Sequence, residues 1–386
     1  MSNLLDKASV ILTPTAYNTS EALCVKPSDG TGDFDFSRAT EATRINSLGL
    51  VETIGINLPR INYEGGCGSW LFEPQSTNLF DYSEDLGNSY WSDFGTEVSR
   101  NLNASQINPS GTAGSYELEG VGGLRRFGIF LTVTPSTDYT LSFYAKNIDA
   151  TLLKALFTNS SITTYTYTSE VNTTDWSRVE INFTTLTGTS TSVQILRDLP
   201  IGESAFFWGL MLEEQSYATS YIPSNGGQVT RNKDLCNNGA TGTGLINSTE
   251  GVLYAEIAAL ANDATNRVIS ISDGTASQRI SIVLGTSSNQ IRGQVLSSST
   301  SFDFSTTSYN TLNNNKIAIS YKLNDFSMWI NGTKVSTDTS GNTPVGMNTI
   351  SFNEGAATLD YFGKTKCIAV WKEALTDAEL TSLTTI

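Results

Sequence analysis

Residues 80–222 alternate apolar and polar positions, with Thr, Tyr, Phe and Val recurring at every second residue. A period of two is typical of β-strands that bury one face. Turn-forming clusters separate the strands at sandwich-like intervals, and we find no convincing amphipathic helix there. The clearest strands are 126–133, 139–145, 176–183 and 205–212. The pattern predicts an antiparallel β-sandwich, a jelly roll, with Trp176 and Trp208 packed in its core.

A second series of strands follows residue 250. Asn331-Gly332 is a strong hairpin turn, because both residue types accept positive φ. Residues 376–383 form the expected helix, with Thr376 as N-cap and Glu379 completing a capping box. The expected strands are 251–257, 267–272, 279–284, 291–296, 316–323 and 326–330. The fold class is therefore all-β, with two antiparallel β-sandwich (jelly-roll) domains behind an irregular N-terminal attachment segment.

The run from Ser37 to Asn78 is the irregular part, with many glycines in short segments. A hairpin joins 41–45 to 50–54, with Gly49 at a position of positive φ. Arginine side chains in such a knot of loops hydrogen-bond carbonyls and carboxylates, so we expect a structural role for them. The arginines concerned are Arg38, Arg44 and Arg60.

The patterns divide the chain into four parts. In the N-terminal arm, residues 8–13 are a candidate strand. The arm is either a plain extension or an anchor that becomes ordered against a partner. The parts are the arm and attachment segment 1–80, a sandwich 81–224, a Gly- and Asn-rich linker 225–250, and a jelly roll 251–386.

Charge and composition narrow the classes of function. The 386 residues carry a net charge of −15, with 23 basic against 38 acidic side chains, so neither nucleic acid nor an anionic membrane is an expected partner. The chain has no histidine, which excludes Ser-His-Asp and Cys-His catalysis. No window approaches a membrane helix, and the N-terminus lacks the features of a signal peptide, so we expect synthesis in a cytoplasm and no membrane insertion.

The four cysteines are far apart and show no C-x-x-C spacing, which argues against zinc. We expect free, packed thiols, since unbridged cysteine behaves as a small core residue. Disulfides stay open as the alternative. The cysteines are Cys24, Cys67, Cys236 and Cys367.

Two long motifs resemble a family of bacteriophage virion proteins. The first reads SRAT…ATRIN…GL.E…N.PR.NYEGG…L.EPQSTNL within Ser37–Asn78. The second runs from Trp208-Gly-Leu-Met-Leu-Glu-Glu through Ala218-Thr-Ser-Tyr-Ile-Pro to Thr230-Arg231. Members of this family are head spikes, head fibres or tail-fibre components, and the sandwich between the motifs is similar to a carbohydrate-binding module. The resemblance implies a virion location and contact with glycans or a host surface.

The part after residue 250 resembles a concanavalin A-like, laminin-G-type domain. The resemblance rests on the Gly251-Val-Leu-Tyr-Ala opening, on Ser327-Met-Trp-Ile-Asn-Gly, and on the closing run from Ala369 to Leu380. It implies a second lectin-like module.

Aromatic side chains are the natural platform for sugars, because sugar C–H faces stack on rings while polar neighbours bond the hydroxyls. Tyr165 and Tyr167 share one face of a strand and are candidate glycan-binding residues. The alternative is that this face belongs to the core. Trp91, in a loop-like segment, is a third candidate.

Acidic residues offer candidates for catalysis and for calcium. Glycoside cleavage needs two carboxyls roughly 5–9 Å apart. Nothing separates the available groups from solvated surface charge, so we predict no catalytic residue and no enzyme. The groups are Glu213 with Glu214, Glu117 with Glu119, and Asp81, Glu84 and Asp85. No cofactor is expected, and a structural calcium ion stays open, with Asp263, Asp273 and Asp360 as loop-placed oxygen donors.

These observations lead to one main hypothesis. The chain is a phage capsid fibre or spike, a homotrimer whose N-terminal segment binds other virion proteins and whose sandwiches bind host-surface glycans. It lacks the shaft repeats usual in tail fibres, which favours the capsid surface over the tail. The alternatives are a tail-associated receptor-binding protein, a glycan depolymerase using a carboxylate pair, and a bacterial adhesin or lectin outside any phage.

Overall fold

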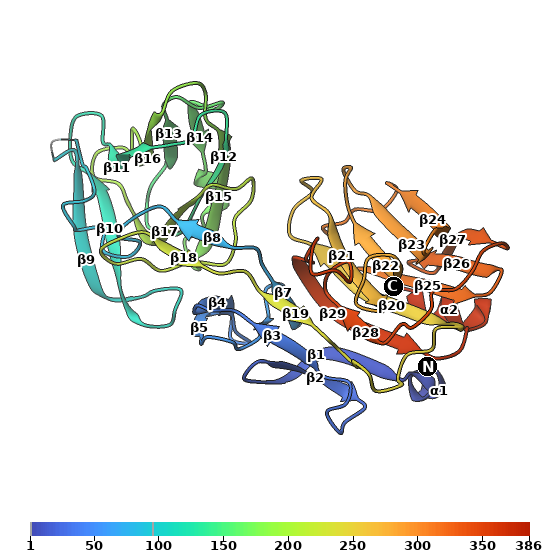
Figure 1. The fold of residues 1–386 in the computed structure, drawn as a ribbon. Coiled ribbons are helices and arrows are strands. Elements are labelled where there is room, and N and C mark those ends of the chain that lie inside the picture. The colour runs from blue at the N-terminus through green and yellow to red at the C-terminus, as the bar shows by residue number, and fades with distance from the viewer. Residues whose placement is uncertain (1, 95) are drawn as a thin grey trace. The chain divides into compact units, whose positions relative to one another are not determined.

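The computed structural model describes residues 2–94 and 96–386 and is built almost wholly of antiparallel strands (Figure 1). The chain separates into two compact units. We call Ala42–Thr53 with Gln75–Arg231 the inserted unit, because its main part interrupts the sequence of the other. The framework unit comprises the described chain up to Glu41, Ile54–Pro74 and Asn232–Ile386.

The inserted unit is a β-sandwich, as the alternation predicts. Its five-stranded sheet has the order β15-β12-β17-β10-β9, and its four-stranded sheet has the order β11-β16-β13-β14. The five-stranded sheet consists of β9 (Val98–Ile107), β10 (Ala113–Gly120), β12 (Asp138–Asn147), β15 (Ser177–Thr184) and β17 (Ser204–Glu213). The four-stranded sheet consists of β11 (Phe127–Thr132), β13 (Lys154–Phe157), β14 (Thr164–Thr166) and β16 (Ser190–Leu196), and a 3₁₀ turn spans Thr168–Glu170.

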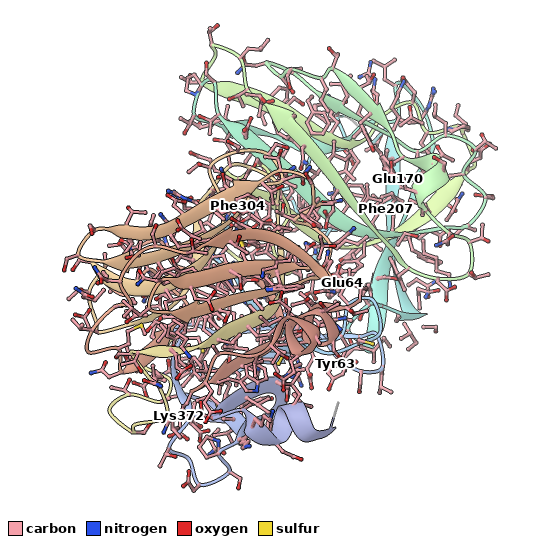
Figure 2. All side chains as sticks on the ribbon, turned by 90° about the vertical axis from the view of Figure 1, so that its right-hand side faces the viewer. Tyr63, Glu64, Glu170, Phe207, Phe304 and Lys372 are labelled. Atoms are coloured by element: carbon pink, nitrogen blue, oxygen red, sulfur yellow. The ribbon has the colours of Figure 1, made fainter. Side chains whose placement is uncertain are left out.

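Strand β12 shows how the alternation builds the interior of this sandwich. Leu141, Phe143 and Ala145 are buried in the core, together with Phe207 of β17, which Figure 2 labels. Tyr144 and Lys146 alternate with them and therefore point to the opposite, outer side of the five-stranded sheet.

Two short pairs of strands complete the inserted unit. Strands β4 (Ala42–Ile45) and β5 (Val51–Ile54) form the expected hairpin, and Gly49 in its turn has a φ of 79°. Strand β8 (Ser76–Asn78) pairs with β18 (Val229–Arg231), with Ser76 opposite Arg231. The two ends of the main segment of the inserted unit are thus hydrogen-bonded to each other.

The framework unit contains an 11-stranded sheet and a five-stranded sheet that share one large apolar core. The 11-stranded sheet has the order β19-β3-β2-β1-β29-β20-β25-β26-β27; in addition, β7 pairs with β29, and β6 pairs with β7. Its strands are β1 (Val10–Asn18), β2 (Glu21–Lys26), β3 (Phe34–Ser37), β6 (Ile61–Asn62), β7 (Ser69–Phe72), β19 (Leu235–Asn237), β20 (Glu250–Ala259), β25 (Asn315–Lys322), β26 (Asp325–Ile330), β27 (Thr333–Asp338) and β29 (Gly363–Trp371). The five-stranded sheet consists of β21 (Arg267–Ser272), β22 (Gln278–Leu284), β23 (Ile291–Ser297), β24 (Thr300–Thr306) and β28 (Thr349–Ser351), in the order β24-β23-β22-β21-β28.

The structure corrects the prediction of a separate attachment segment over 1–80. Strand β1 pairs with β29, the closing strand of the C-terminal sandwich, and Val10 and Leu12 lie fully buried in the shared core. The physical reason is that β1 buries its apolar side chains in the core while its backbone forms hydrogen bonds with the backbone of β29. Residues 225–250 are also more than a linker, because β18 and β19 are paired strands within that range.

Local signals in the framework unit are confirmed. Asn331 and Gly332 have φ values of 49° and 81°, as a type I′ hairpin turn requires. Helix α2 (Asp377–Thr384) begins after Thr376 with a full capping box to Glu379. A short helix that the pattern did not predict, α1 (Ser2–Lys7), precedes β1. Within the described residues, no helix is both long and apolar enough to span a membrane.

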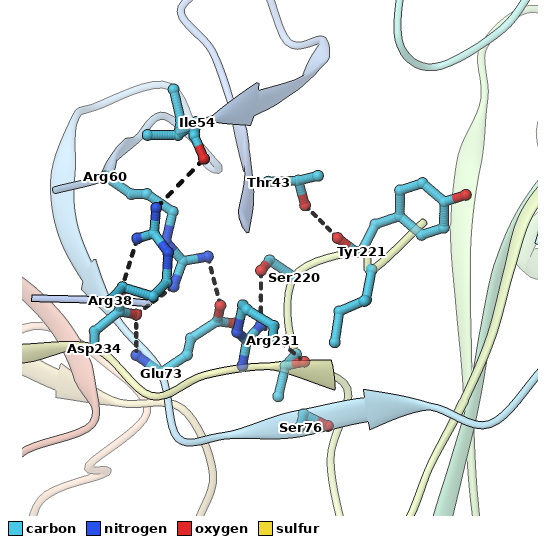
Figure 3. Close-up of polar contacts among 12 residues, drawn as sticks. Arg38, Thr43, Ile54, Arg60, Glu73, Ser76, Ser220, Tyr221, Arg231 and Asp234 are labelled. Atoms are coloured by element: carbon cyan, nitrogen blue, oxygen red, sulfur yellow. Dashed lines mark hydrogen bonds and ion pairs between the residues drawn. The ribbon is translucent and has the colours of Figure 1, made fainter. Parts of the chain in front are cut away.

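The arginines of the irregular stretch have the expected structural role: Arg44 pairs with Glu52 at 2.9 Å, and Figure 3 shows Arg38 and Arg60. Arg38 contacts Asp234 at 2.9 Å, and Arg60 contacts both Asp234 and, at 2.6 Å, Glu73. All four side chains are essentially buried. The backbone N–H of Glu73 donates to the Asp234 carboxylate at 2.8 Å, and the N–H of Asp234 donates to the Glu73 carbonyl at 3.0 Å. This ion cluster fastens the end of one segment of the framework unit to the start of the next.

The predicted packing of the cysteines is confirmed for two of them. Cys24 and Cys236 are buried, and burial raises the pKa of the Cys236 thiol well above its usual value. Cys67 is exposed, and Cys367 is partly buried.

Candidate functional site

Two of the three predicted glycan-binding residues are buried, which corrects their assignment. Trp91 is 2% exposed and packs against Phe80 and Phe127, with ring centroids 4.9 and 5.4 Å apart. Its Nε1 donates to the Tyr82 carbonyl at 3.1 Å. The sequence around Trp91 is loop-like, but the chain there turns the Trp91 ring inward against the core of the sandwich. No face of the ring is left for a sugar.

Tyr167 is the second correction. Its side chain is completely buried, and its hydroxyl donates to the Ile195 carbonyl at 2.8 Å. Strand β14 ends at Thr166, so the strand register that would have placed Tyr165 and Tyr167 together stops before Tyr167. Tyr165 stays half-exposed, and its hydroxyl donates to Glu170, labelled in Figure 2, at 2.8 Å. The predicted pair of exposed tyrosines is not formed.

Trp176 is the aromatic residue that the sequence interpretation misplaced. It was expected in the core, but it is only partly buried and lies just before β15. Its Nε1 donates to the Ile107 carbonyl at 2.8 Å, and its ring centroid is 6.5 Å from that of Phe206. The signal was available: Val179 and the later core residues of β15 are odd-numbered, so an even-numbered residue such as Trp176 is out of phase with them and points outward.

An aromatic cluster covers part of the outer side of the five-stranded sheet. The Trp208 ring lies 5.6 Å from Tyr144 and 4.7 Å from Tyr221, between centroids. Trp208 is buried, as predicted, but in this outer cluster and not inside the sandwich. Val51 of the β4–β5 hairpin packs on the same cluster, and its N–H donates to the Pro109 carbonyl at 2.9 Å. The hairpin therefore forms a wall beside the sheet.

A groove of about 390 Å³ lies between this hairpin and Trp176. Apolar walls come from the hairpin and from the end of β9, while Tyr144 and Trp176 supply aromatic surface. The groove is lined by Gly49, Leu50, Val51, Gln106, Ile107, Asn108, Pro109, Tyr144, Lys146, Thr174, Asp175 and Trp176.

The polar groups of the groove differ in how far the protein uses them. The Asn108 side chain is committed to its own turn, where it accepts from the Ser110 N–H at 2.9 Å and donates to the Gly114 carbonyl at 2.9 Å. Asp175 accepts from the Thr174 hydroxyl at 2.9 Å, and neither Asp175 nor Lys146 forms an ion pair with the described residues. Lys146 and Asp175 are thus available to a ligand.

The acidic residues singled out in the sequence are distributed over several places. Glu213 is buried and accepts from Ser76 at 2.5 Å and from the hydroxyl and N–H of Thr219, and burial raises its pKa. Glu214 accepts from Tyr139, Glu84 from Tyr221, and Asp85 from Tyr116, at 3.0, 2.8 and 2.7 Å. Glu117 and Glu119 lie two residues apart on β10, and Asp81 lies after β8. None of these residues lines the groove.

The three calcium candidates also have protein partners. Asp263 pairs with Arg267 at 2.8 Å, and Asp360 pairs with Lys233 at 2.7 Å. Asp273 caps its own turn by accepting from the N–H of Thr275 at 2.9 Å. Within residues 2–94 and 96–386, no group of three or more Cys, Asp or Glu side chains is arranged to hold a metal ion.

Comparisons with known proteins complete the description. No protein-family model and no curated protein matches the chain. Among solved structures, similar chains include the CBM40 domain of a Ruminococcus gnavus IT-sialidase bound to α2,3-sialyllactose, at 13% identity and a TM-score of 0.32, over 36% of this chain and 84% of that one. Domain 4 of AbnA, a GH43 arabinanase from Geobacillus stearothermophilus, in complex with arabinotriose, is 15% identical, with a TM-score of 0.33, over 44% and 82%.

The tandem CBM22-1–CBM22-2 domain of Paenibacillus barcinonensis Xyn10C is 10% identical, with a TM-score of 0.28, and the match covers 81% of this chain and 95% of that one. All three likenesses have TM-scores below 0.5, so they assign neither a family nor a ligand to this chain. What its own coordinates establish is an all-β protein with antiparallel sandwiches and an aromatic-lined groove.

Proposed function

We propose that the protein is a glycan-binding protein whose ligand lies in the groove beside Trp176. The observation that carries the proposal is a partly exposed tryptophan that borders a groove in which Lys146 and Asp175 form no ion pair with the described residues. Sugars combine an apolar C–H face with hydroxyls, so they need both an aromatic platform and hydrogen-bonding groups. Trp176 offers the platform, held in place by its bond to Ile107, while Lys146, Asp175 and Gln106 face the hydroxyls.

Binding, without cleavage, is the activity we propose for this groove. The two-carboxylate mechanism needs a pair of acids across the scissile bond. Asp175 is the one carboxylic acid among the described residues that line the groove. Release of reducing sugar from capsular polysaccharide by the purified protein, abolished by Asp175→Asn, would replace this proposal with a depolymerase.

The wider role that we propose is that of a phage capsid fibre or spike, a homotrimer that presents this groove to host-surface glycans. Support comes from the motifs in Ser37–Asn78 and from Trp208 to Arg231, which resemble virion proteins. We expect an antibody against this chain to bind to the capsid when labelled virions are imaged. Decoration of the tail would move the protein there, and a virion mass spectrum without the chain would refute the role. Light scattering of the purified protein tests the trimer.

The direct test of the groove is Trp176→Ala on a glycan array, followed by titration of the best ligand. We expect the affinity to fall roughly thirtyfold or more, the loss that an interface tryptophan worth about 2 kcal/mol gives. Phe130→Ala is the matched control, because Phe130 is 63% exposed on β11, in the other sheet of the same sandwich. Loss of binding in the Phe130 variant with Trp176→Ala unaffected would refute this groove as the site.

A further inference from the structure

Lys146 is exceptional among the basic side chains of the inserted unit. The other arginines and lysines of its described residues all have a polar partner in the protein. Six of them form ion pairs: Arg44, Arg100, Arg126, Lys154, Arg178 and Arg197. Arg125 donates to the Leu199 carbonyl at 2.7 Å, and Arg231 donates to Ser220 at 3.0 Å. Among the basic residues of the unit that the structure describes, Lys146 alone has a side chain with neither a hydrogen bond nor an ion pair.

The position of Lys146 makes this lack of a partner informative. It lies on the outer side of β12, two residues after Tyr144, and it is partly buried in the wall of the groove. Partial burial removes water from a cation. Without a partner to replace that water, the charged form is less favourable in free energy. The chain has an excess of acidic residues, with a net charge of −15, yet none of those that the structure describes forms an ion pair with this ammonium group. An anionic ligand would supply the missing partner.

From this geometry we infer that the groove selects acidic glycans, whose carboxylate pairs with Lys146 while a sugar ring stacks on Trp176. The inference rests on the proposed function and specifies its ligand class. A lysine is a compact point charge, which suits a single carboxylate. Asp175 in the same groove repels the two charges of a phosphate monoester more strongly than the single charge of a carboxylate. Its own oxygens accept hydrogen bonds from neighbouring sugar hydroxyls.

The test uses ligand pairs that differ only in charge. Oligogalacturonate and 3′-sialyllactose are each titrated beside their methyl esters, and a sulfated oligosaccharide with its desulfated form makes a third pair. For at least one carboxylate pair, we expect the acid to bind roughly tenfold more tightly than its ester, as charge-assisted hydrogen bonds do. Lys146→Met should abolish that difference by weakening the acid far more than the ester, whereas Lys146→Arg should retain most of it. The preference should weaken as salt is raised.

The control variant is Lys372→Met, which makes the same change in net charge at an exposed lysine of the framework unit, labelled in Figure 2. An equal loss in the two variants would show a general charge effect and would overturn the inference. Equal binding of acid and ester would also overturn the inference. If Trp176→Ala still weakened both, the proposed function would remain intact. A preference confined to the sulfated pair would overturn the carboxylate assignment. Binding to wild type that Trp176→Ala does not change would refute the proposed function itself.

Discussion

The ion cluster of the framework unit and the groove of the inserted unit treat charge in opposite ways. In the cluster, Arg38 and Arg60 are fully buried and share Asp234, and each charge has an opposite charge beside it. In the groove, Lys146 and Asp175 are near the surface and form no ion pair within the described chain. Charges whose partners lie inside the protein stabilise a local structure, whereas charges without such partners are free to recognise a ligand.

The strongest way to break this comparison is to remove the shared carboxylate. Asp234→Asn leaves two buried guanidinium groups short of negative charge, and we expect the free energy of unfolding to fall by about 3–5 kcal/mol. Urea unfolding monitored by circular dichroism measures it. Glu64→Gln is the matched control, since Glu64 pairs with Lys364 at the surface, at 2.6 Å, and exposed pairs contribute about 1 kcal/mol or less. Equal losses in the two variants would contradict the structural role of the cluster.

The two tryptophans sharpen the same contrast for aromatic side chains. Trp91→Ala leaves a cavity in the core, so we expect about 3–5 kcal/mol of destabilisation. Trp176→Ala removes one partly exposed ring and one hydrogen bond, and we expect about 1 kcal/mol. Thermal and urea unfolding measure both. A loss with Trp176→Ala as large as that with Trp91→Ala would show that Trp176 is a packing residue, as its place next to a strand first suggested.

A pH experiment tests a paired charge at the surface of the inserted unit. The Arg126 guanidinium hydrogen-bonds Glu97 at 2.7 Å and lowers the pKa of that carboxyl from 4.5 to about 2. The ionised form is therefore favoured in the folded state, so the stabilisation is present above pH 4.5 and is lost as the pH falls toward 2. Glu97→Gln should have a lower unfolding temperature than wild type at pH 7, and the gap should narrow over that range. A gap independent of pH would contradict the pairing.

The smallest expected effect belongs to Lys146. Because its side chain has no polar partner among the described residues, Lys146→Met should change the free energy of unfolding by no more than about 0.5 kcal/mol. Urea unfolding of this variant beside Lys372→Met measures the difference. A loss of several kcal/mol would mean that the ammonium group holds the fold together and is not reserved for a ligand.

Much of the fold could be predicted from local pattern. Alternation located the strands of both sandwiches, and Asn331-Gly332 and Thr376 located a turn and a helix start, because each depends on nearby residues only. Strand partners over long distances are different. Val10 and Leu12 look like a short strand of an arm, and nothing local shows that β29, more than 350 residues later, is their partner.

The site was harder to predict than the fold. Trp91 and Tyr167 have the residue type of a sugar platform, but exposure depends on which way the chain turns after the last paired residue. Trp176 was misplaced for the opposite reason, since only its phase relative to Val179 separates outward from inward. The lack of an ion pair at Lys146 could not be predicted from the sequence. It depends on where the acidic residues of the described chain lie after folding.

The hairpin formed by β4 and β5 has a consequence for how such proteins exchange parts. Pairing of Ser76 with Arg231 brings the two ends of residues 75–231 together, so this segment could be exchanged as one piece. The hairpin lies upstream of that segment, yet Val51 packs on the outer aromatic cluster and Leu50 lines the groove. A replacement that takes this segment alone would place a new groove floor beside the original hairpin wall. The wall and the floor of the groove therefore come from two segments that are separate in the sequence.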